Sequence, residues 1–241
     1  MHRFSKIDKT PLYNSRIINS YIKIIHKKYK DVDVNELLRH AGMKPYEVAD
    51  QGHWFTQTQI NRFHDRLSEV TKNENIAREA GRYGSSPEAS GAMRQFFLGL
   101  VGLAGAYSII RKGASKFTRS TIYQFRNLSA NKVEITVTPN KGVKERPFQC
   151  ENRVGFLEAV ALTFGHKLPR VDHPECVFKG GTTCRYIVSW EKSLSDTVKR
   201  VRNIIALTLL PSCLLSGLLV SVSDFLIINL SAVTFVLLLT Y

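Results

Sequence analysis

Residues 118–138 read TRSTIYQFRNLSANKVEITVT, and this stretch decides the fold class. Over residues 132–138, valine and isoleucine alternate with glutamate and threonine, which is the period-two pattern of a half-buried strand. Residues 118–127 are rich in the β-branched and aromatic types that favour strands. The short polar link at residues 129–131 predicts that the two strands form an antiparallel hairpin.

Helical periodicity dominates the chain before this hairpin. Over residues 14–30, isoleucines and tyrosines recur at helical spacing, with basic residues mostly on the opposite face. Asp33 is expected to cap the next helix, and Thr56 with Gln59 fits a capping box. Further helices are expected at 34–40, 56–71, 75–83, 90–103, 106–114 and 153–164, and strands at 170–178 and 184–191. The sequence therefore predicts an α+β fold, with N-terminal helices packed on an antiparallel sheet.

Three of the four cysteines, together with one histidine, form the strongest chemical signal in the chain. His173 lies three residues before Cys176, and a glycine-containing loop then returns the chain to Cys184. Cys150, further upstream, is positioned to supply a fourth ligand. Thiolate and imidazole are donors that suit tetrahedral zinc. Reduced thiols packed as small core hydrophobes explain the same residues equally well on spacing alone.

The run from Cys150 to Trp190 carries two longer motifs. They are Cys-Glu-Asn-Arg-x-Gly-Phe-Leu-Glu-Ala from residue 150, and His-Pro-Glu-Cys followed by Gly-Gly-Thr-Thr-Cys-Arg-Tyr-x-Val-x-Trp over residues 173–190. These motifs resemble the 4-vinyl-reductase type of domain, a family that includes the effector-binding domains of phenol-responsive transcription activators. The resemblance covers roughly residues 80–190 and is specific in its last 40 residues.

The resemblance implies a ligand set for a structural zinc. In the phenol sensors the zinc is held by a cysteine, a glutamate and two further cysteines eight residues apart. Cys150, Cys176 and Cys184 match the three cysteines, and His173 falls at the position of the glutamate. Glu175 is a neighbouring alternative for that fourth position. The implied zinc-stapled segment forms the C-terminal part of the sheet domain.

A second resemblance concerns the N-terminal part. Residues 34–42 and 75–81, with the helix between them, are similar to the ligand-sensing domain of some arabinose-regulator-type activators. Both resemblances imply small-molecule sensing rather than catalysis. No Gly-x-Ser-x-Gly, His-Glu-x-x-His or phosphate-loop motif occurs, so no enzyme is predicted. An enzyme or tetrapyrrole- or haem-binding protein of the same fold, and a ligand-free adaptor, remain the alternatives.

The chain carries a formal net charge of +14 with a pI near 9.8. Such a charge is compatible with nucleic-acid binding. No helix-turn-helix, RNP or zinc-finger spacing accompanies it, so nucleic acid is not expected as a partner. A basic face attracted to anionic lipid is the simpler interpretation.

The C-terminal residues 203–241 are uncharged apart from Asp224. About 20 apolar residues suffice to cross a bilayer. The sequence therefore predicts a transmembrane helical hairpin that turns at Asp224. Basic residues in the segment 192–202 would keep residues 1–202 in the cytoplasm, as in a multi-pass protein of a bacterial-type inner membrane.

These observations predict four regions. They are an N-terminal helical part at 1–80, a sensory α+β part at 81–191, a basic juxtamembrane linker at 192–202 and the hairpin at 203–241. The expected function is to bind a small, apolar ligand and to pass a conformational signal to a downstream module such as a kinase, in a homodimer. The candidate ligand-binding residues, each of which can equally be core, are Phe96, Phe97, Tyr107, Tyr123 and Phe156.

Overall fold

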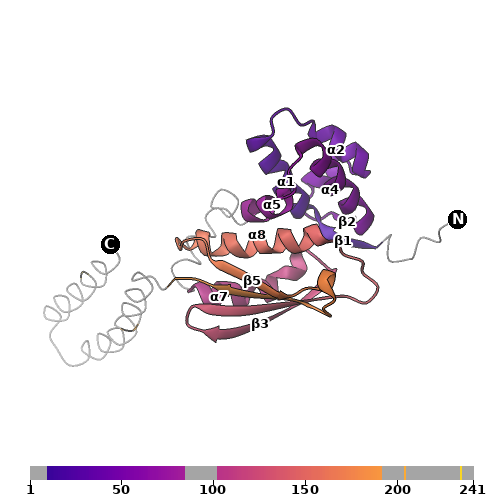
Figure 1. Cartoon of the computed structure of the whole chain (residues 1–241). Helices are drawn as coiled ribbons and strands as arrows, with labels where there is room; N and C mark the ends of the chain where they lie inside the picture. The colour runs from indigo at the N-terminus through magenta and orange to yellow at the C-terminus, as the bar shows by residue number, and fades with distance from the viewer. Residues whose placement is uncertain (1–9, 85–101, 192–203, 205–233, 235–241) are drawn as a thin grey trace, which may run out of the picture. The chain divides into compact units, whose positions relative to one another are not determined.

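Helices occupy the N-terminal half of the described chain, and an antiparallel sheet occupies much of the remainder (Figure 1). The computed structural model describes residues 10–84 and 102–191, together with Ile204 and Thr234. The chain divides into two compact units, residues 1–191 and 192–241. Its elements are β1 (Pro11–Asn14), α1 (Ser15–Lys28), α2 (Val34–Ala41), α3 (Pro45–Ala49), β2 (Trp54–Thr56), α4 (Gln57–Thr71), α5 (Ile76–Gly84), α7 (Leu103–Gly113), the 3-10 helix η2 (Ala114–Lys116), β3 (Thr121–Ser129), β4 (Lys132–Pro139), α8 (Pro147–Thr163), β5 (Arg170–Glu175), the 3-10 helix η3 (Val177–Lys179) and β6 (Cys184–Ser189).

The predicted α+β class is confirmed. Strands β3, β4, β6 and β5 form an antiparallel sheet in that order, and β1 pairs separately with β2. The predicted hairpin is β3–β4, in which Tyr123 lies opposite Val137 and Phe125 lies opposite Ile135. Val133, Ile135 and Val137 are buried, as their alternation predicts. One face of the sheet therefore belongs to the core.

Both helix starts that the sequence indicated are capped. The carboxylate of Asp33 accepts hydrogen bonds from the backbone N–H groups of Asn35 and Glu36 at the start of α2. The Thr56 side chain accepts from the backbone of Gln59, whose own side chain accepts from the backbone of Thr56. These bonds satisfy N–H groups that have no partner inside the helix.

Helix α8 begins at Pro147, whereas the sequence predicted a start at Arg153. Proline suits the first helical position because its missing N–H would be unpaired there in any case. The Gln149 side chain then accepts from the backbone N–H of Arg146, at 2.7 Å. Residues of α8 contribute to two clusters of buried apolar residues, one among the N-terminal helices and one on the sheet. Because α8 is buried on several sides, its apolar residues do not follow a single helical stripe, and the start of the helix could not be recognised from periodicity.

Two glycines bring α5 and α8 into backbone contact. A Cβ atom added at Gly155 would lie 1.9 Å from the carbonyl oxygen of Arg78. A Cβ atom added at Gly81 would lie 2.0 Å from the carbonyl oxygen of Asn152. The two helices can approach this closely only because neither glycine has a side chain. This contact joins the helical part to the sheet part.

Several short elements differ from the expectations. The strand expected over 170–178 ends at Glu175 and is followed by η3, and the sequence did not indicate β1, β2 or α3. These pieces have three to five residues, too few to show a period. The helix expected at 90–103 lies outside the described residues except at its last two positions. The boundary predicted between residues 80 and 81 stays a prediction, although α5 runs through it.

The predicted membrane location is corrected. Among the described residues, no helix combines the length and the apolar character that crossing a bilayer requires. The proposed hairpin at 203–241 lies outside the described residues, apart from Ile204 and Thr234. The localisation rested on an apolar run and on flanking charges alone, and it is withdrawn.

Candidate ligand cavity and cysteine–histidine cluster

A cavity of about 340 Å³ is lined by residues from α1, α5, α7, α8 and the strands β3, β4 and β6. Its volume lies within the range of small-molecule binding sites. Most of its walls are apolar, and the apolar lining residues of the described chain are Ile17, Ala80, Ala106, Ile109, Ile110, Ala114, Phe117, Ile135, Val137, Phe156 and Leu157. The cavity therefore offers an apolar space of limited size between helices and sheet.

The residues predicted to bind a ligand fall in three places. Tyr123 and Phe156 line the cavity. Tyr107 is fully buried in the core, is not among the lining residues and donates a hydrogen bond to the carbonyl of Leu157 at 2.8 Å. Phe96 and Phe97 lie outside the described residues. A ligand contact by any of these residues stays a prediction.

Arg153 brings a buried cation to the cavity. Its side chain is only 11% exposed, and its guanidinium forms an ion pair with Glu145, whose side chain is 1% exposed. The Nε–H of Arg153 donates to the hydroxyl of Tyr123 at 3.3 Å. Burial alone would lower the pKa of Arg153, but the Glu145 carboxylate and nearby tyrosines raise that pKa well above its ordinary value. This end of the cavity therefore always contains one buried positive charge, balanced by one carboxylate, while the second lining cation, Arg16, bonds to the Gln51 side chain in an exposed pair.

Tyr186 on β6 completes this polar end. The residue is fully buried, and its hydroxyl has no oxygen or nitrogen hydrogen-bond partner among the described residues. Burial raises the pKa of Tyr186, so the phenol keeps its proton and remains a donor. Its ring stacks on His173 with a centroid separation of 4.3 Å.

Neither Arg153 nor Tyr186 was predicted as a site residue, although the sequence pattern around each indicated which way its side chain faces. Arg153 follows Cys150 by three residues and so lies on the same face of a helix. Tyr186 alternates with Cys184 and Val188 on the buried face of its strand. The alternation identified an inward-facing side chain, but it did not distinguish a core tyrosine from one at a cavity.

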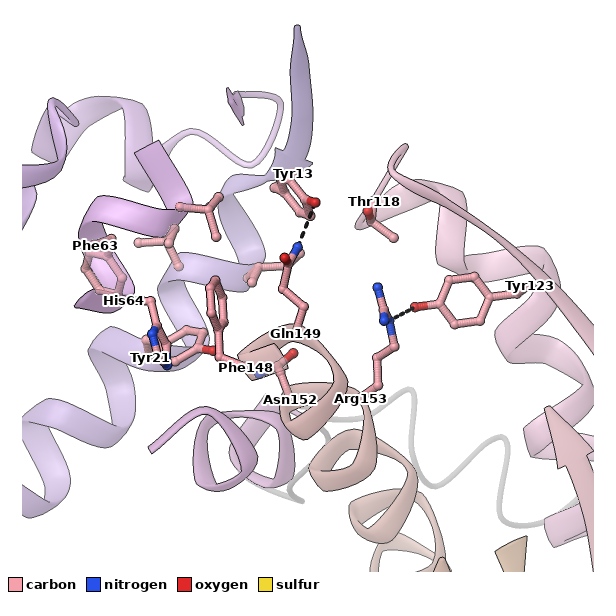
Figure 2. Close-up of a pocket in the computed structure, with 13 residues that line it drawn as sticks. Tyr13, Tyr21, Phe63, His64, Thr118, Tyr123, Phe148, Gln149, Asn152 and Arg153 are labelled. Atoms are coloured by element: carbon pink, nitrogen blue, oxygen red, sulfur yellow. Dashed lines mark hydrogen bonds between the residues drawn. The ribbon is translucent and has the colours of Figure 1, made fainter. Parts of the chain in front are cut away.

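A smaller cavity of about 70 Å³ adjoins the larger one, and the two share Arg153 and Tyr123 in their lining. Figure 2 shows Gln149 pointing toward Tyr13, whose hydroxyl it reaches at 2.7 Å. His64 lies in the same cavity, with its ring stacked on Phe148 at a centroid separation of 3.8 Å. Neither ring nitrogen of His64 has a hydrogen-bond partner among the described residues.

The four residues predicted to bind a metal converge. The ligand atoms of Cys150, His173, Cys176 and Cys184 all lie within 4.8 Å of one another. Cys150 comes from α8, His173 from β5, Cys184 from the first position of β6, and Cys176 from the residue before η3. The sulfur atoms of Cys150 and Cys184 are 3.3 Å apart. We refer to these four residues as the Cys/His cluster.

His173 rather than Glu175 belongs to this cluster. The carboxylate of Glu175 accepts hydrogen bonds from the backbone and side chain of Thr183, at 3.3 and 3.1 Å. Gly180, at φ +87°, turns the intervening loop in a left-handed conformation that other residues rarely adopt. The hydrogen bond with Cys150 lowers the pKa of Cys184, which favours a thiolate there. A thiolate beside imidazole is the usual donor set for thiophilic metal ions.

No family model matches the chain, and no curated protein matches it. Solved structures do match, and they define the fold as H-NOX-like. An H-NOX protein from S. oneidensis in the Fe(II)NO state is 13% identical, with a TM-score of 0.57, over 74% of this chain and 99% of that one. An oxygen-binding H-NOX domain related to soluble guanylate cyclases is 16% identical, with a TM-score of 0.58, over 75% and 96%. At these identities the likeness establishes the fold alone.

The assignment to 4-vinyl-reductase-type domains is wrong. The structures that match are H-NOX domains, and they cover about three quarters of this chain. The resemblance was specific over only the last 40 residues, where it depended on cysteine spacing and short motifs. Such local patterns identify a cluster of side chains and not the architecture that holds it.

The prediction of zinc as the cofactor is also contradicted. The matching structures are described by Fe(II) ligation states, by bound oxygen and, in one case, by haem redox potential and porphyrin distortion. That last structure is 16% identical, with a TM-score of 0.56, over 73% of this chain and 99% of that one. The spacing of the cysteines and the histidine predicted that these four side chains lie together, and they do. Spacing does not determine which cofactor a protein binds.

Proposed function

We propose that this chain carries a small-molecule sensory domain whose ligand occupies the 340 Å³ cavity. The observation that carries the proposal is the combination of extensive apolar walls with one buried, neutralised cation, Arg153. Small-molecule sites typically combine such walls with a few polar groups that fix orientation. The H-NOX-like fold supports a sensory role, since one matching domain binds oxygen and is related to soluble guanylate cyclases.

Haem is the second candidate ligand, because the matching structures are described by iron ligation and haem. Protein ligands to haem iron are histidine, cysteine, methionine or tyrosine. Tyrosine is the only one of these types among the described lining residues, and burial raises the pKa of Tyr186 away from the ligating tyrosinate form. The sequence holds no histidine or cysteine between Asp65 and Gln149, and Met93 lies outside the described residues. The described lining therefore does not fit haem.

A purified full-length protein separates these candidates. We expect native mass spectrometry to show a bound small molecule that is lost on denaturation, and organic extraction to release it for identification. A Soret absorption band would identify haem instead. Ala106→Phe, which fills the cavity from α7, serves as the control that should lose the ligand. The proposal fails if the protein carries no ligand and shows no thermal stabilisation by small apolar compounds.

A sensory role also requires a readout. A ligand shifts a conformational equilibrium only if it binds two arrangements with different affinity. The downstream module, for example a kinase or cyclase, remains part of the proposal. Nothing in the described residues supports the predicted homodimer. No catalytic role is proposed for the cavity.

The Cys/His cluster is proposed as a site for a thiophilic metal ion whose identity is left open. What supports this is the convergence of three thiols and one imidazole within 4.8 Å. In addition, the Nε2 atom of His173 is buried without a hydrogen-bond partner among the described residues. Elemental analysis of the purified full-length protein tests the proposal directly.

A further inference from the structure

The polar end of the larger cavity presents donors. The Tyr186 hydroxyl is buried without an oxygen or nitrogen partner among the described residues, and its one interaction there is with the Cys150 sulfur, a weak acceptor. The Tyr123 hydroxyl accepts from Arg153, which leaves its own hydrogen available. Arg153 uses one guanidinium nitrogen for Glu145 and contacts the Cys150 sulfur only at 3.8 Å. An arginine side chain has five N–H donors and no acceptor.

The other polar residues of the lining already form hydrogen bonds with other groups of the protein. Asn152 donates to the carbonyl of Ala77 at 3.0 Å, and Ser20 donates to the carbonyl of Ile17 at 2.7 Å. The Thr118 hydroxyl pairs with Ser120, at 2.7 Å. Arg16, the other cation in the lining, donates from two guanidinium nitrogens to the side-chain oxygen of Gln51 at 3.3 and 3.1 Å, in an exposed pair. Unused hydrogen-bonding capacity at the buried end of the lining is therefore concentrated at Tyr123, Arg153 and Tyr186.

Charge balance at this end disfavours an anionic ligand. Arg153 is already neutralised by the buried carboxylate of Glu145. A ligand carboxylate at this buried end would add a second negative charge beside one cation, where an unpaired charge is costly, because Arg16 lies apart in an exposed pair with Gln51. A neutral acceptor avoids this cost and still pairs with the unused donors, since leaving buried donors unpaired is itself unfavourable.

We infer that the ligand is an uncharged molecule with an apolar body and a carbonyl-type acceptor, held at Tyr186, Tyr123 and Arg153. This inference rests on the proposed function, because it assigns a chemical class to the ligand of the same cavity. The apolar body lies against walls such as Ile135, Phe156 and Ile110. The acceptor oxygen receives hydrogen bonds from the tyrosine hydroxyls and the guanidinium.

Three probes of one shape test the inference with the full-length protein. They are 2-acetylnaphthalene, which carries a ketone, 2-naphthoate, which carries a carboxylate, and 2-ethylnaphthalene, which has no polar group. Dissociation constants are measured by titration after bound material has been extracted. We expect the ketone to bind about tenfold more tightly than the hydrocarbon, the gain from about one to two net hydrogen bonds. The carboxylate should bind more weakly than the ketone.

Tyr186→Phe removes one donor without changing the shape of the ring. We expect it to weaken ketone binding by about fivefold to tenfold and to leave hydrocarbon binding unchanged. Tyr107→Phe is the matched control, because Tyr107 is not a lining residue and its hydroxyl already bonds to the backbone carbonyl of Leu157. The control should lower thermal stability and leave ketone binding unchanged. Tyr186→Phe keeps the ring that stacks on His173 and loses only a weak contact with the Cys150 sulfur, so the variant should fold normally.

The outcomes separate the inference from the proposed function. If no probe binds and no ligand co-purifies, the proposed function fails. If the probes bind equally, or the carboxylate binds most tightly, the cavity is a ligand site but the inference is overturned. The inference is also overturned if Tyr186→Phe and Tyr107→Phe affect ketone binding equally.

Discussion

The larger cavity and the Cys/His cluster contain side chains from the same helix but differ in chemistry. Cys150 and Arg153 are one turn apart on α8, and the Cys150 sulfur is 3.8 Å from the guanidinium. The cavity is mostly apolar, with its polar groups gathered at one end. The cluster is made entirely of metal-ligand types, all within 4.8 Å. The difference shows that one helix can contribute a metal-ligand type of residue to one site and a buried cation to another, one turn apart.

The largest effect is expected where α8 meets α5, because both sites depend on the position of α8. In Gly155→Ala the new Cβ would lie 1.9 Å from the carbonyl oxygen of Arg78, so the two helices must separate. We expect a loss of about 3 kcal/mol in the free energy of unfolding, at the upper end of overpacking effects. Urea denaturation measures this loss, and probe binding and metal content should decline together.

Gly102→Ala is the matched control, since a Cβ there meets nothing within 4 Å. Its cost should stay below about 1 kcal/mol, because Gly102 is the N-cap of α7 and alanine suits that position less well than glycine. If Gly155→Ala removed probe binding but left metal content and stability intact, α8 would not be the element that the two sites share.

The second prediction concerns a variant that should affect the larger cavity and leave the Cys/His cluster unchanged. Ala106→Phe directs a large side chain from α7 into the open space of the cavity. Binding of 2-acetylnaphthalene should weaken by about tenfold or more, since the apolar body loses its space. Metal content should not change. Ser108→Ala on the same helix is the control, because its hydroxyl bonds to the carbonyl of Gly105 and the residue is not in the lining.

The two sites were unequally visible in the sequence. Cysteine and histidine are rare residues, so four of them at short intervals predicted a cluster that the structure brings together. The cavity depends on where common apolar residues leave space, and no spacing reveals that. Phe156 and Tyr123 were chosen correctly as lining residues, whereas Tyr107 packs into the core. Arg153 was not predicted, because its burial as a cation depends on an ion pair with Glu145, which lies on a different segment.

The fold class was predictable because it depends on patterns that are local in the sequence. The alternation at Val133, Ile135 and Val137 and the cap at Asp33 are local signals, and both are confirmed. The family assignment was wrong because it extended a local motif to the whole domain. The sheet order β3-β4-β6-β5 depends on pairings distant in sequence, such as Ile135 with Tyr186, which local patterns do not encode.

The third prediction acts on the cluster alone. Cys176→Ser removes one thiolate, and we expect it to abolish stoichiometric metal binding and to cost about 2 kcal/mol of stability, because metal binding is coupled to folding. A chelator should destabilise the wild-type protein and leave the variant unchanged. Probe binding should change by less than about threefold. Cys213→Ser, outside the described residues, is the control. Wild-type protein without metal and without a chelator response would mean that the thiols are ordinary core side chains.

The smallest effect concerns two half-buried histidines, one in the Cys/His cluster and one in the smaller cavity. His173 lies in the cluster beside three thiols, and its Nε2 has no hydrogen-bond partner among the described residues. His64 lies in the smaller cavity against Phe148, and both of its ring nitrogens lack such partners. His64 is therefore a desolvated imidazole that lies apart from the three thiols.

Burial lowers the pKa of His64 from 6.5 to about 4; Asp65 opposes this shift and Arg146 adds to it. Because the folded pKa is depressed, the unfolded state binds more protons between these values, and stability declines as the pH falls from about 6.5 toward 4. His64→Phe should remove that part of the decline, measured as the urea midpoint at pH 7 and at pH 5. His40→Gln, an exposed histidine on α2, should keep the wild-type slope. Equal slopes for wild type and His64→Phe would show that protonation of His64 does not oppose folding, and the contrast between the two histidines would then fail.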